Sequence, residues 1–483
     1  MKSEIELKKI LKERFSFDEF KPGQLEILQS LFNQQDTLAI LPTGGGKSLI
    51  YQFYGEIMQP RILIVSPLIS LMQDQVNRMN YLGIKKAITI NSSLDFSYRN
   101  YVIKNLDRYQ YIFVSPETLS NNQVINRLME VGIDLLVIDE AHCISQWGPD
   151  FRPEYLNLGQ VKTDLGDPLT LMLTATANEK TRFDILNGLG FDKKRVKIIV
   201  NSIDRPNLFI NCVDVHDENQ KDETLFSILN KLNGSGIIYF SSKSKAEQVS
   251  QLINENTNKA SLPYHGGMDA LQRFKIQQQF MKDEIEIICA TSAFGMGIDK
   301  SNVRFVIHYH FPANIQDYYQ EIGRAGRDQL PCVSILLFNY SDINIHNGLI
   351  DNTYPDSSLI HYAYTHPNLL ETFKDEKSQL IKFYYDHDYS ELDLIELFKQ
   401  RKSQKQQQLN QMLEYIQYQG CKREWLLNYF GDKKKHDLEF CCNNDSLFNN
   451  YLLVSDKLFE TGHRTNQSMN WQDKLKKIFL LKN

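Results

Sequence analysis

The chain has 483 residues, which is enough for about three domains of ordinary size. Apolar residues make up 42% and charged residues 23%, and no stretch approaches the roughly 18 unbroken apolar residues of a membrane span. The net charge of −5 excludes a globally basic nucleic-acid binder, so any contact with nucleic acid has to come from local patches.

The N-terminal residues 1–9 predict a charged amphipathic helix without the apolar core of a secretory signal, so we expect a cytoplasmic protein. Four of the seven cysteines stand alone within the first 340 residues. This scatter indicates reduced thiols and not a disulfide framework.

Short apolar runs alternate with helical stretches up to about residue 340, and each run ends at a polar turn or one with Gly or Pro. This pattern is typical of parallel sheets covered on both faces. Pro206 restricts the residue before it and marks Asp204–Asn207 as a linker. We therefore expect an α/β fold with tandem domains at residues 1–203 and 204–345. The predicted strands are 37–41, 61–65, 111–114, 135–138 and 169–173, then 236–240, 286–290, 304–308 and 333–338.

Beyond residue 345 helical periodicity dominates. Residues 346–402 predict a helical insertion of unknown role, residues 403–447 a further helical subdomain, and residues 448–483 a C-terminal tail. The basic, Gln-rich stretch 399–408 predicts a solvated helix face, with contact to DNA as the alternative.

A glycine-rich loop follows the first predicted strand and precedes a helix that is expected to begin near Leu49. Glycines let backbone N–H groups approach a phosphate closely, and the helix N-terminus adds positive potential. Lys47 is expected to reach the β- and γ-phosphates of ATP, and Ser48 to hold Mg²⁺. Leu41 stands where the full P-loop pattern has Gly, and a structural turn is the alternative. The predicted ATP-binding residues of the loop are Thr43, Gly44, Gly45, Gly46, Lys47 and Ser48.

The buried strand at 135–138 delivers Asp139 and Glu140 at its C-terminal end. Asp139 is expected to bind Mg²⁺, and Glu140 to orient and deprotonate the attacking water. An isolated Asp-Glu pair is usually a loop charge, but its place after a buried strand argues against that interpretation.

Arg324 and Arg327 stand three residues apart in the second series, and they share one face if the segment is helical. An arginine finger has to reach across a cleft to neutralise charge on the γ-phosphate in the transition state. Arg327 is the preferred finger and Arg324 the alternative. Standing alone, the segment would be interpreted as a surface arginine pair.

Taken together, these motifs resemble the superfamily 2 helicases, and specifically the RecQ family. The resemblance extends over residues 20–24, 66–76, 115–118, 173–177 and 290–299. It implies two RecA-like domains, ATP and Mg²⁺ as cofactors, and a DNA helicase that moves 3′ to 5′ on single-stranded DNA in repair or recombination.

The resemblance also implies individual roles. Gln24 would read the adenine edge, although Lys21 stands where the family usually has Arg. The residues implied to couple hydrolysis to domain closure are His142, Thr174, Thr176 and Gln320.

Residues 143–155 are similar to the aromatic-rich loop of RecQ enzymes, which senses single-stranded DNA and signals to the ATP site. Trp147 and Phe151 offer faces on which bases stack, worth about 1–3 kcal/mol each, and Arg152 adds a cation. Core packing is the alternative for the two rings, and the dense polar interruptions argue against it. Pro149 stands where the family usually has His.

The zinc site of the family is expected to be lost. The family places one Cys on a helix and three more as C-x₂-C-x₂-C, and zinc binds four such ligands. Cys421 stands in the first position. If Cys441 is the second ligand, Asn444 and Leu447 occupy the other two positions, where Asn is a poor ligand and Leu is none.

Two nearby side chains are possible replacements for these ligands, Cys442 and His436. Cys442 is adjacent to Cys441 and badly spaced to substitute, and nothing in the spacing of His436 demands a ligand role. We therefore expect zinc to be absent, with Cys421 and Cys441 as remnants. Apolar packing would then hold the helices together, through Trp425, Leu426, Leu427, Tyr429 and Phe430.

The residues after Leu447 are too few for the winged helix of the family, which usually carries the strand-separating hairpin. Two alternatives to a DNA helicase stay open, and only the first of them rests on this shortage. One is a DNA-stimulated ATPase that remodels DNA and unwinds it poorly. The other is a related RNA helicase, against which the loop at 143–155 argues.

Overall fold

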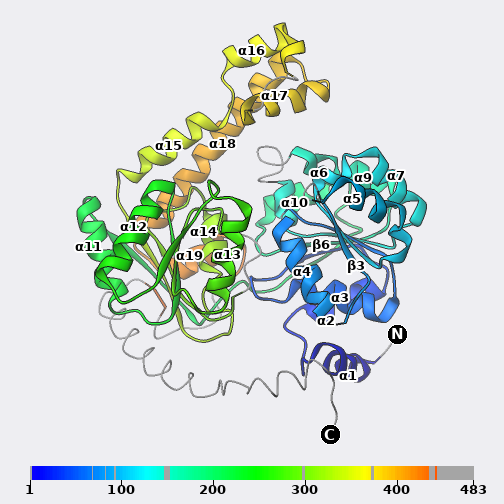
Figure 1. Ribbon diagram of the computed structural model, residues 1–483, viewed down its shortest axis with the longest axis horizontal. Helices are drawn as coiled ribbons and strands as arrows, with labels where there is room; N and C mark the ends of the chain where they lie inside the picture. The colour runs from blue at the N-terminus through cyan, green and yellow to red at the C-terminus, as the bar shows by residue number, and fades with distance from the viewer. Residues whose placement is uncertain are drawn as a thin grey trace.

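The computed structural model describes residues 3–67, 69–81, 83–91, 94–145, 153–295, 300–370, 375–433 and 441–442. Two α/β domains lie side by side, and a helical arm extends from the second domain (Figure 1). The expected fold class is confirmed, with two parallel-sheet domains followed by a mainly helical part.

The first domain contains a seven-stranded parallel sheet in the order β3-β4-β2-β5-β6-β1-β7. All four residues of β1, β2, β4 and β5 are buried, because helices cover both faces of the sheet. The strands are β1 Thr37–Ile40, β2 Ile62–Val65, β3 Ala87–Ile90, β4 Tyr111–Val114, β5 Leu135–Ile138, β6 Leu169–Thr174 and β7 Lys197–Val200. The α-helices are α1 Glu4–Phe15, α2 Gln24–Phe32, α3 Lys47–Met58, α4 Ile69–Tyr81, α5 Phe96–Lys104, α6 Pro116–Leu119, α7 Asn122–Val131, α9 Leu158–Asp164 and α10 Glu179–Gly188, and the 3₁₀ turns are η1 Leu106–Arg108, η2 Ala141–Ile144 and η3 Pro153–Asn157.

The second domain contains a six-stranded parallel sheet in the order β10-β11-β9-β12-β13-β8. The nine strands predicted from the sequence all form across the two sheets, with ends shifted by at most one residue. The strands here are β8 Leu208–Asp214, β9 Ser235–Tyr239, β10 Ser261–Tyr264, β11 Ile287–Ala290, β12 Val303–His308 and β13 Cys332–Phe338. The helices are α11 Glu218–Leu229, α12 Lys243–Asn256, α13 Ala270–Met281 and α14 Ile315–Ile322.

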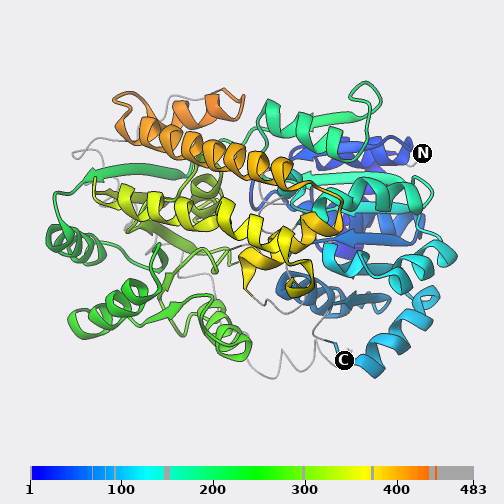
Figure 2. The same cartoon turned by 90° about the horizontal axis from the view of Figure 1, so that it is seen from above.

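The arm begins and ends on the second domain. Its two long helices, α15 and α18, lie side by side, and α16 and α17 pack on a small apolar core at its far end (Figures 1 and 2). Phe383 and His387 at this end line a cleft of about 510 Å³ together with first-domain residues such as Pro116 and Asp164. The helices are α15 Asp342–Thr353, α16 Ser357–Thr365, the 3₁₀ turn η4 Pro367–Leu369, α17 Glu376–Asp386, α18 Glu391–Gln417 and α19 Lys422–Tyr429.

Helix α18 runs without a break through residue 402, where a boundary between two segments was expected. The basic stretch on it is mostly exposed, as predicted, but Arg401 is buried and donates a hydrogen bond of 2.6 Å to the Tyr384 hydroxyl. That guanidinium joins α18 to α17.

Helix α19 lies against the second domain. Leu426, Leu427 and Phe430 are buried, and Trp425 and Tyr429 pack against the same core, which confirms the apolar packing predicted for this segment. None of the helices in the described part of the chain combines the length and apolar character needed to cross a membrane.

Candidate nucleotide site between the two domains

The loop between β1 and α3 has the backbone geometry that a phosphate requires. Gly44 and Gly46 adopt φ values of +79° and +74°, which residues with a side chain rarely adopt. Gly46 caps α3, which begins at Lys47, two residues earlier than predicted. A glycine-rich loop that leads into a helix N-terminus suits an anion, so phosphate binding by this loop, with Ser48 in the first turn of α3, stays a prediction.

Lys47 lies beside both carboxylates that follow β5. Its Nζ is 2.9 Å from Glu140 Oε1 and 4.0 Å from Asp139 Oδ1. Burial raises the pKa of Asp139 to about 6, against the opposing charge of Lys47. Burial also acts to raise the pKa of Glu140, but Lys47 and the other cations around it lower that pKa below its usual value. The two neighbouring carboxyl groups therefore differ in acidity, and Glu140 is the one that stays ionised at lower pH.

Glu140 has a left-handed backbone with φ of +49°, which is unusual for a residue with a side chain. Its own N–H donates to Asp139 Oδ1 at 3.0 Å. Strained conformations of this kind cost of order 1–3 kcal/mol and cluster at functional sites. Here the turn directs both carboxylates toward the glycine-rich loop.

A chain of hydrogen bonds connects the second domain to these carboxylates. The Gln320 amide group donates to His142 Nε2 at 3.1 Å, so the neutral imidazole carries its proton on Nδ1. His142 Nδ1 then donates to Thr174 Oγ1 at 2.9 Å, and that hydroxyl donates to the Thr176 carbonyl at 3.1 Å. Burial lowers the pKa of His142, which keeps the ring neutral. All four predicted coupling residues therefore lie in one relay.

The Gln24 side chain is buried against the loop. Its Nε2 donates to the carbonyls of Gly45 and Gly46 at 3.0 and 3.1 Å, and its Oε1 accepts from Lys21 N at 2.9 Å. Lys21 Nζ donates to the Gly44 carbonyl at 2.7 Å. Both residues support the loop backbone, and adenine recognition by Gln24 stays a prediction.

The segment with the two predicted arginines crosses the interface between the domains. It follows α14 as a series of turns and is not helical, so the two side chains do not share a helix face. A Cβ placed on Gly44 would lie 3.4 Å from Arg327 Cγ, and one on Gly323 would lie 2.2 Å from Thr43 Oγ1. Arg327 therefore lies directly against the loop. Arg324 is buried, and its charge lowers the pKa of Glu140.

Arg205, in the linker, is a site residue that the sequence argument missed. It is buried, and it donates to the carbonyl of Gly323 at 2.8 Å and to those of Ala325 and Gly326 at 2.6 Å. Three carbonyls of the arginine segment thus share one guanidinium, whose planar fork suits such an arrangement. Its only signal in the sequence was its place beside Pro206.

We expect Arg205→Ala to lower kcat for ATP hydrolysis by about 10- to 100-fold with little change in KM, since misplacing a catalytic group by about 1 Å can cost 10²-fold. Steady-state ATPase assays would measure this, with exposed Arg195→Ala as the control. A kcat that falls only in proportion to the loss of folded protein would contradict a positioning role.

The predicted DNA-sensing residues Trp147, Phe151 and Arg152 lie outside the described residues. The flanking Ile144 and Tyr155 are buried in the core of the first domain. Residues 115–118 also belong to the resemblance to the family. Within this segment Ser115 is buried, and its hydroxyl hydrogen-bonds Thr118 Oγ1 at 3.1 Å.

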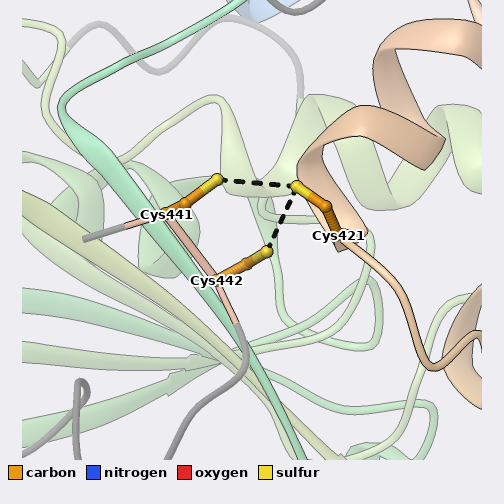
Figure 3. Close-up of side chains that lie close together, drawn as sticks. All are labelled: Cys421, Cys441 and Cys442. Atoms are coloured by element: carbon orange, nitrogen blue, oxygen red, sulfur yellow. Dashed lines mark hydrogen bonds between the residues drawn. The ribbon is translucent and has the colours of Figure 1, made fainter. Parts of the chain in front are cut away.

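The cysteines near the end of the described chain correct one expectation. Cys442 Sγ lies 3.6 Å from Cys421 Sγ, and Cys441 Sγ lies at the same distance from it (Figure 3). Cys442 was expected to be badly spaced to substitute as a ligand, but its sulfur lies as near to Cys421 as that of Cys441 does. Spacing along the chain could not reveal that both consecutive side chains turn toward α19.

Three family models match successive parts of the chain. The model for DEAD/DEAH box helicases matches residues 21–184, and the helicase conserved C-terminal domain matches residues 220–329. The RecQ zinc-binding model matches residues 378–446, which gives no support to the expected absence of zinc.

RecS of Bacillus subtilis, named as an ATP-dependent DNA helicase, is 37% identical over 448 residues, which cover 89% of this chain and 90% of RecS. The chain belongs to the RecQ family. RecQ of Pasteurella multocida is 35% identical, and the match covers 94% of this chain but only 65% of that RecQ. The helicase R290 of Acanthamoeba polyphaga mimivirus carries the name of an RNA helicase. It is 34% identical, and the match covers 90% of this chain and 71% of R290.

Solved structures confirm the fold of this RecQ family member. The helicase MrfA bound to DNA and AMPPNP superimposes with a TM-score of 0.59 at 18% identity, over 89% of this chain and 58% of MrfA. Mss116p bound to single-stranded RNA and AMP-PNP superimposes with a TM-score of 0.58 at 17% identity, over 84% of this chain and 91% of its own. At such low identity the likeness concerns the fold alone.

Proposed function

We propose that the protein is an ATP-dependent DNA helicase that translocates 3′ to 5′ on single-stranded DNA and unwinds duplexes in DNA repair or recombination. The observation that carries the proposal is the composite site between the domains, where Arg327 lies against the phosphate loop of the other domain. Such a site links hydrolysis to the relative movement of the two domains. Its partner is DNA, and its place of action is the cytoplasm.

ATP supplies the energy of the cycle, and the residues present fit it. The loop offers backbone N–H groups, Lys47 offers a cation for the β- and γ-phosphates, and Ser48 and Asp139 offer oxygens for Mg²⁺. Glu140 is the proposed general base, since Lys47 and the other cations around it keep it anionic and able to hold the attacking water and accept its proton. Arg327 neutralises charge that develops on the γ-phosphate.

Two assays test the polymer and the direction. ATPase rates with single-stranded DNA, duplex DNA and RNA of equal length are expected to rise most with single-stranded DNA. Unwinding of a duplex with a 3′ tail is expected to exceed unwinding of the same duplex with a 5′ tail. Preferential unwinding from the 5′ tail would overturn the direction.

An RNA helicase is the second candidate, and the similarity to R290 favours it. Stimulation by RNA that exceeds stimulation by DNA would decide for it. Strong ATPase stimulation by DNA without strand separation would instead indicate a remodelling enzyme that unwinds weakly. Trp147, Phe151 and Arg152 remain the proposed sensors of DNA.

We expect Gln320→Ala to reduce DNA-stimulated ATP hydrolysis about tenfold, within the range of 5- to 150-fold typical of coupling between two sites. The variant loses the only side-chain donor that the described residues place on His142 Nε2 from the second domain. A double-mutant cycle with His142→Ala measures the pair directly, and exposed Gln272→Ala is the control. Additive losses in the cycle would show that the relay does not act as a unit.

A further inference from the structure

The far end of the arm and the first domain border the cleft of about 510 Å³ described above. Phe383 and His387 line it from α17 and the turn that follows, and Pro116 and Asn157 are among the residues that line it from the other side. This end of the arm lies over the side of the first domain that carries α6 (Figure 1). The cleft has the size of a small-molecule site, and it belongs to neither domain alone.

An aromatic pair forms the wall of the cleft on the arm. The rings of Phe383 and His387 are stacked, with centroids 4.1 Å apart and an angle of 28° between their planes. His387 Nδ1 donates to the Phe383 carbonyl at 2.7 Å, which holds the second ring against the first and leaves Nε2 as an acceptor in the neutral ring. Phe383 is partly buried and His387 is exposed. Flat aromatic side chains of this kind are the faces on which nucleobases stack.

The wall on the first domain combines apolar and amide side chains. Leu119 and Val161 are buried there, and Asn122 and Gln160 are exposed. Each amide side chain carries both donors and an acceptor, so this wall can form hydrogen bonds with the edge of a base while the aromatic pair contacts its face. An apolar lining with a few polar groups is typical of sites for small planar ligands.

The charges of the cleft favour the base of a nucleotide over its phosphate. Glu154 and Asp164 line it, and Asp164 Oδ1 accepts from Gln160 Nε2 at 2.8 Å. No lysine or arginine lies among the described residues of the lining, so a phosphate would meet two carboxylates there. The exocyclic amino groups of cytosine, adenine and guanine are donors that a carboxylate can accept, and thymine has none.

Two segments that resemble parts of the helicase family meet at the cleft. Pro116 belongs to residues 115–118, and Glu154 belongs to residues 143–155, which are similar to the loop that senses single-stranded DNA. We propose that the cleft holds one base of the single strand, stacked on the Phe383–His387 pair. The proposal rests on the DNA-binding function proposed above. Because the arm is attached to the second domain, such a base would join the two domains through the strand.

Binding of a fluorescent single-stranded DNA to the full chain tests the aromatic wall. Phe383→Ala is expected to raise Kd about 5- to 150-fold, the range for loss of one stacked base, and Phe383→Trp to keep the wild-type affinity. His387→Ala, at an exposed position that leaves the fold intact, is expected to weaken binding in the same direction. Tyr362 and His366 form a matched aromatic pair on the same arm, stacked at 4.6 Å and 25° but outside the lining of the cleft. Tyr362→Ala is therefore the control and is expected to bind as the wild type does.

An abasic site moved along the strand, one nucleotide at a time, tests whether a base occupies the cleft. The wild type is expected to show one position where the missing base costs about as much affinity as Phe383→Ala does, and the variant to show no further loss there. Thymine at that position is expected to bind more weakly than cytosine, because it has no amino group. The slope of log Kd against log salt is expected to be the same in Phe383→Ala and the wild type, since no phosphate contact is lost.

Several outcomes would overturn the base site. Wild-type affinity in both Phe383→Ala and His387→Ala would do so, as would a position-specific abasic loss that persists in full in Phe383→Ala. Equal weakening by Tyr362→Ala would show that the fold of the arm matters and not the cleft, and a shallower salt slope would indicate a phosphate contact instead. If the wild type binds single-stranded DNA and these variants do not differ from it, only the cleft proposal fails. A wild type that does not bind single-stranded DNA would overturn the proposed function as well.

Discussion

Lys47→Ala is expected to lower kcat/KM for ATP hydrolysis by about 10³-fold while the protein stays folded. The ammonium group lies 2.9 Å from Glu140 and is the cation placed to stabilise charge on the phosphates. Its removal leaves two neighbouring carboxylates without their cation, and their repulsion adds to the loss of nucleotide affinity. Steady-state ATPase kinetics and nucleotide binding would measure both effects.

Lys197→Ala is the matched control, because Lys197 is an exposed lysine that pairs with Glu26 at 3.7 Å and lies outside the site. It is expected to hydrolyse ATP at the wild-type rate. Circular dichroism and the melting temperature establish that Lys47→Ala is folded. ATP hydrolysis that persists in a folded Lys47→Ala protein would contradict the assignment of the site.

Arg327→Ala is expected to lower kcat by about 10³-fold, at the lower end of the range for arginine fingers, with a much smaller effect on ATP affinity. The side chain comes from the second domain and lies against Gly44, so it can act when the domains are closed. Arg327→Lys is expected to restore little activity, since an ammonium cannot reproduce the planar fork of a guanidinium. Single-turnover hydrolysis separates the chemical step from binding and release.

Arg324→Ala discriminates between the two candidates. Arg324 is buried, and its charge acts on Glu140 through space, so its loss is expected to reduce stability as well as activity. If the folded Arg324→Ala protein loses 10³-fold in kcat while Arg327→Ala stays active, Arg324 and not Arg327 is the arginine finger. Arg195→Ala on the surface serves as the control here too.

Local pattern was sufficient for nine of the strands and for the nucleotide loop. These nine strands are short apolar runs buried on both faces, so each is visible as a run of consecutive apolar residues, whereas β7 is largely exposed and was not predicted. The loop is equally local, because positive φ at Gly44 and Gly46 is a property of the glycines themselves. The same holds for Asp139 and Glu140, whose position follows directly from the end of β5.

Contacts between distant segments could not be predicted in this way. Arg205 stands in a linker, and its role arises because the arginine segment, more than a hundred residues later, folds back onto it. The relay from Gln320 to His142 likewise depends on how the two domains pack. The helix considered for Arg324 and Arg327 does not form, and the segment is a series of turns in which Gly323 packs closely on Thr43.

The sequence by itself determined the family, the α/β class, the two tandem sheets and the chemistry of the phosphate loop, because each depends on residues close together in the chain. Only the tertiary structure decided that Arg327 reaches the loop and that Arg205 supports its segment. It also decided that Cys442 lies beside Cys421, against the prediction from spacing. The physical reason is the same in each case, since ligand sets and hydrogen-bond networks form by proximity in space, and β8 brings Cys441 and Cys442 to α19 across about twenty residues of chain.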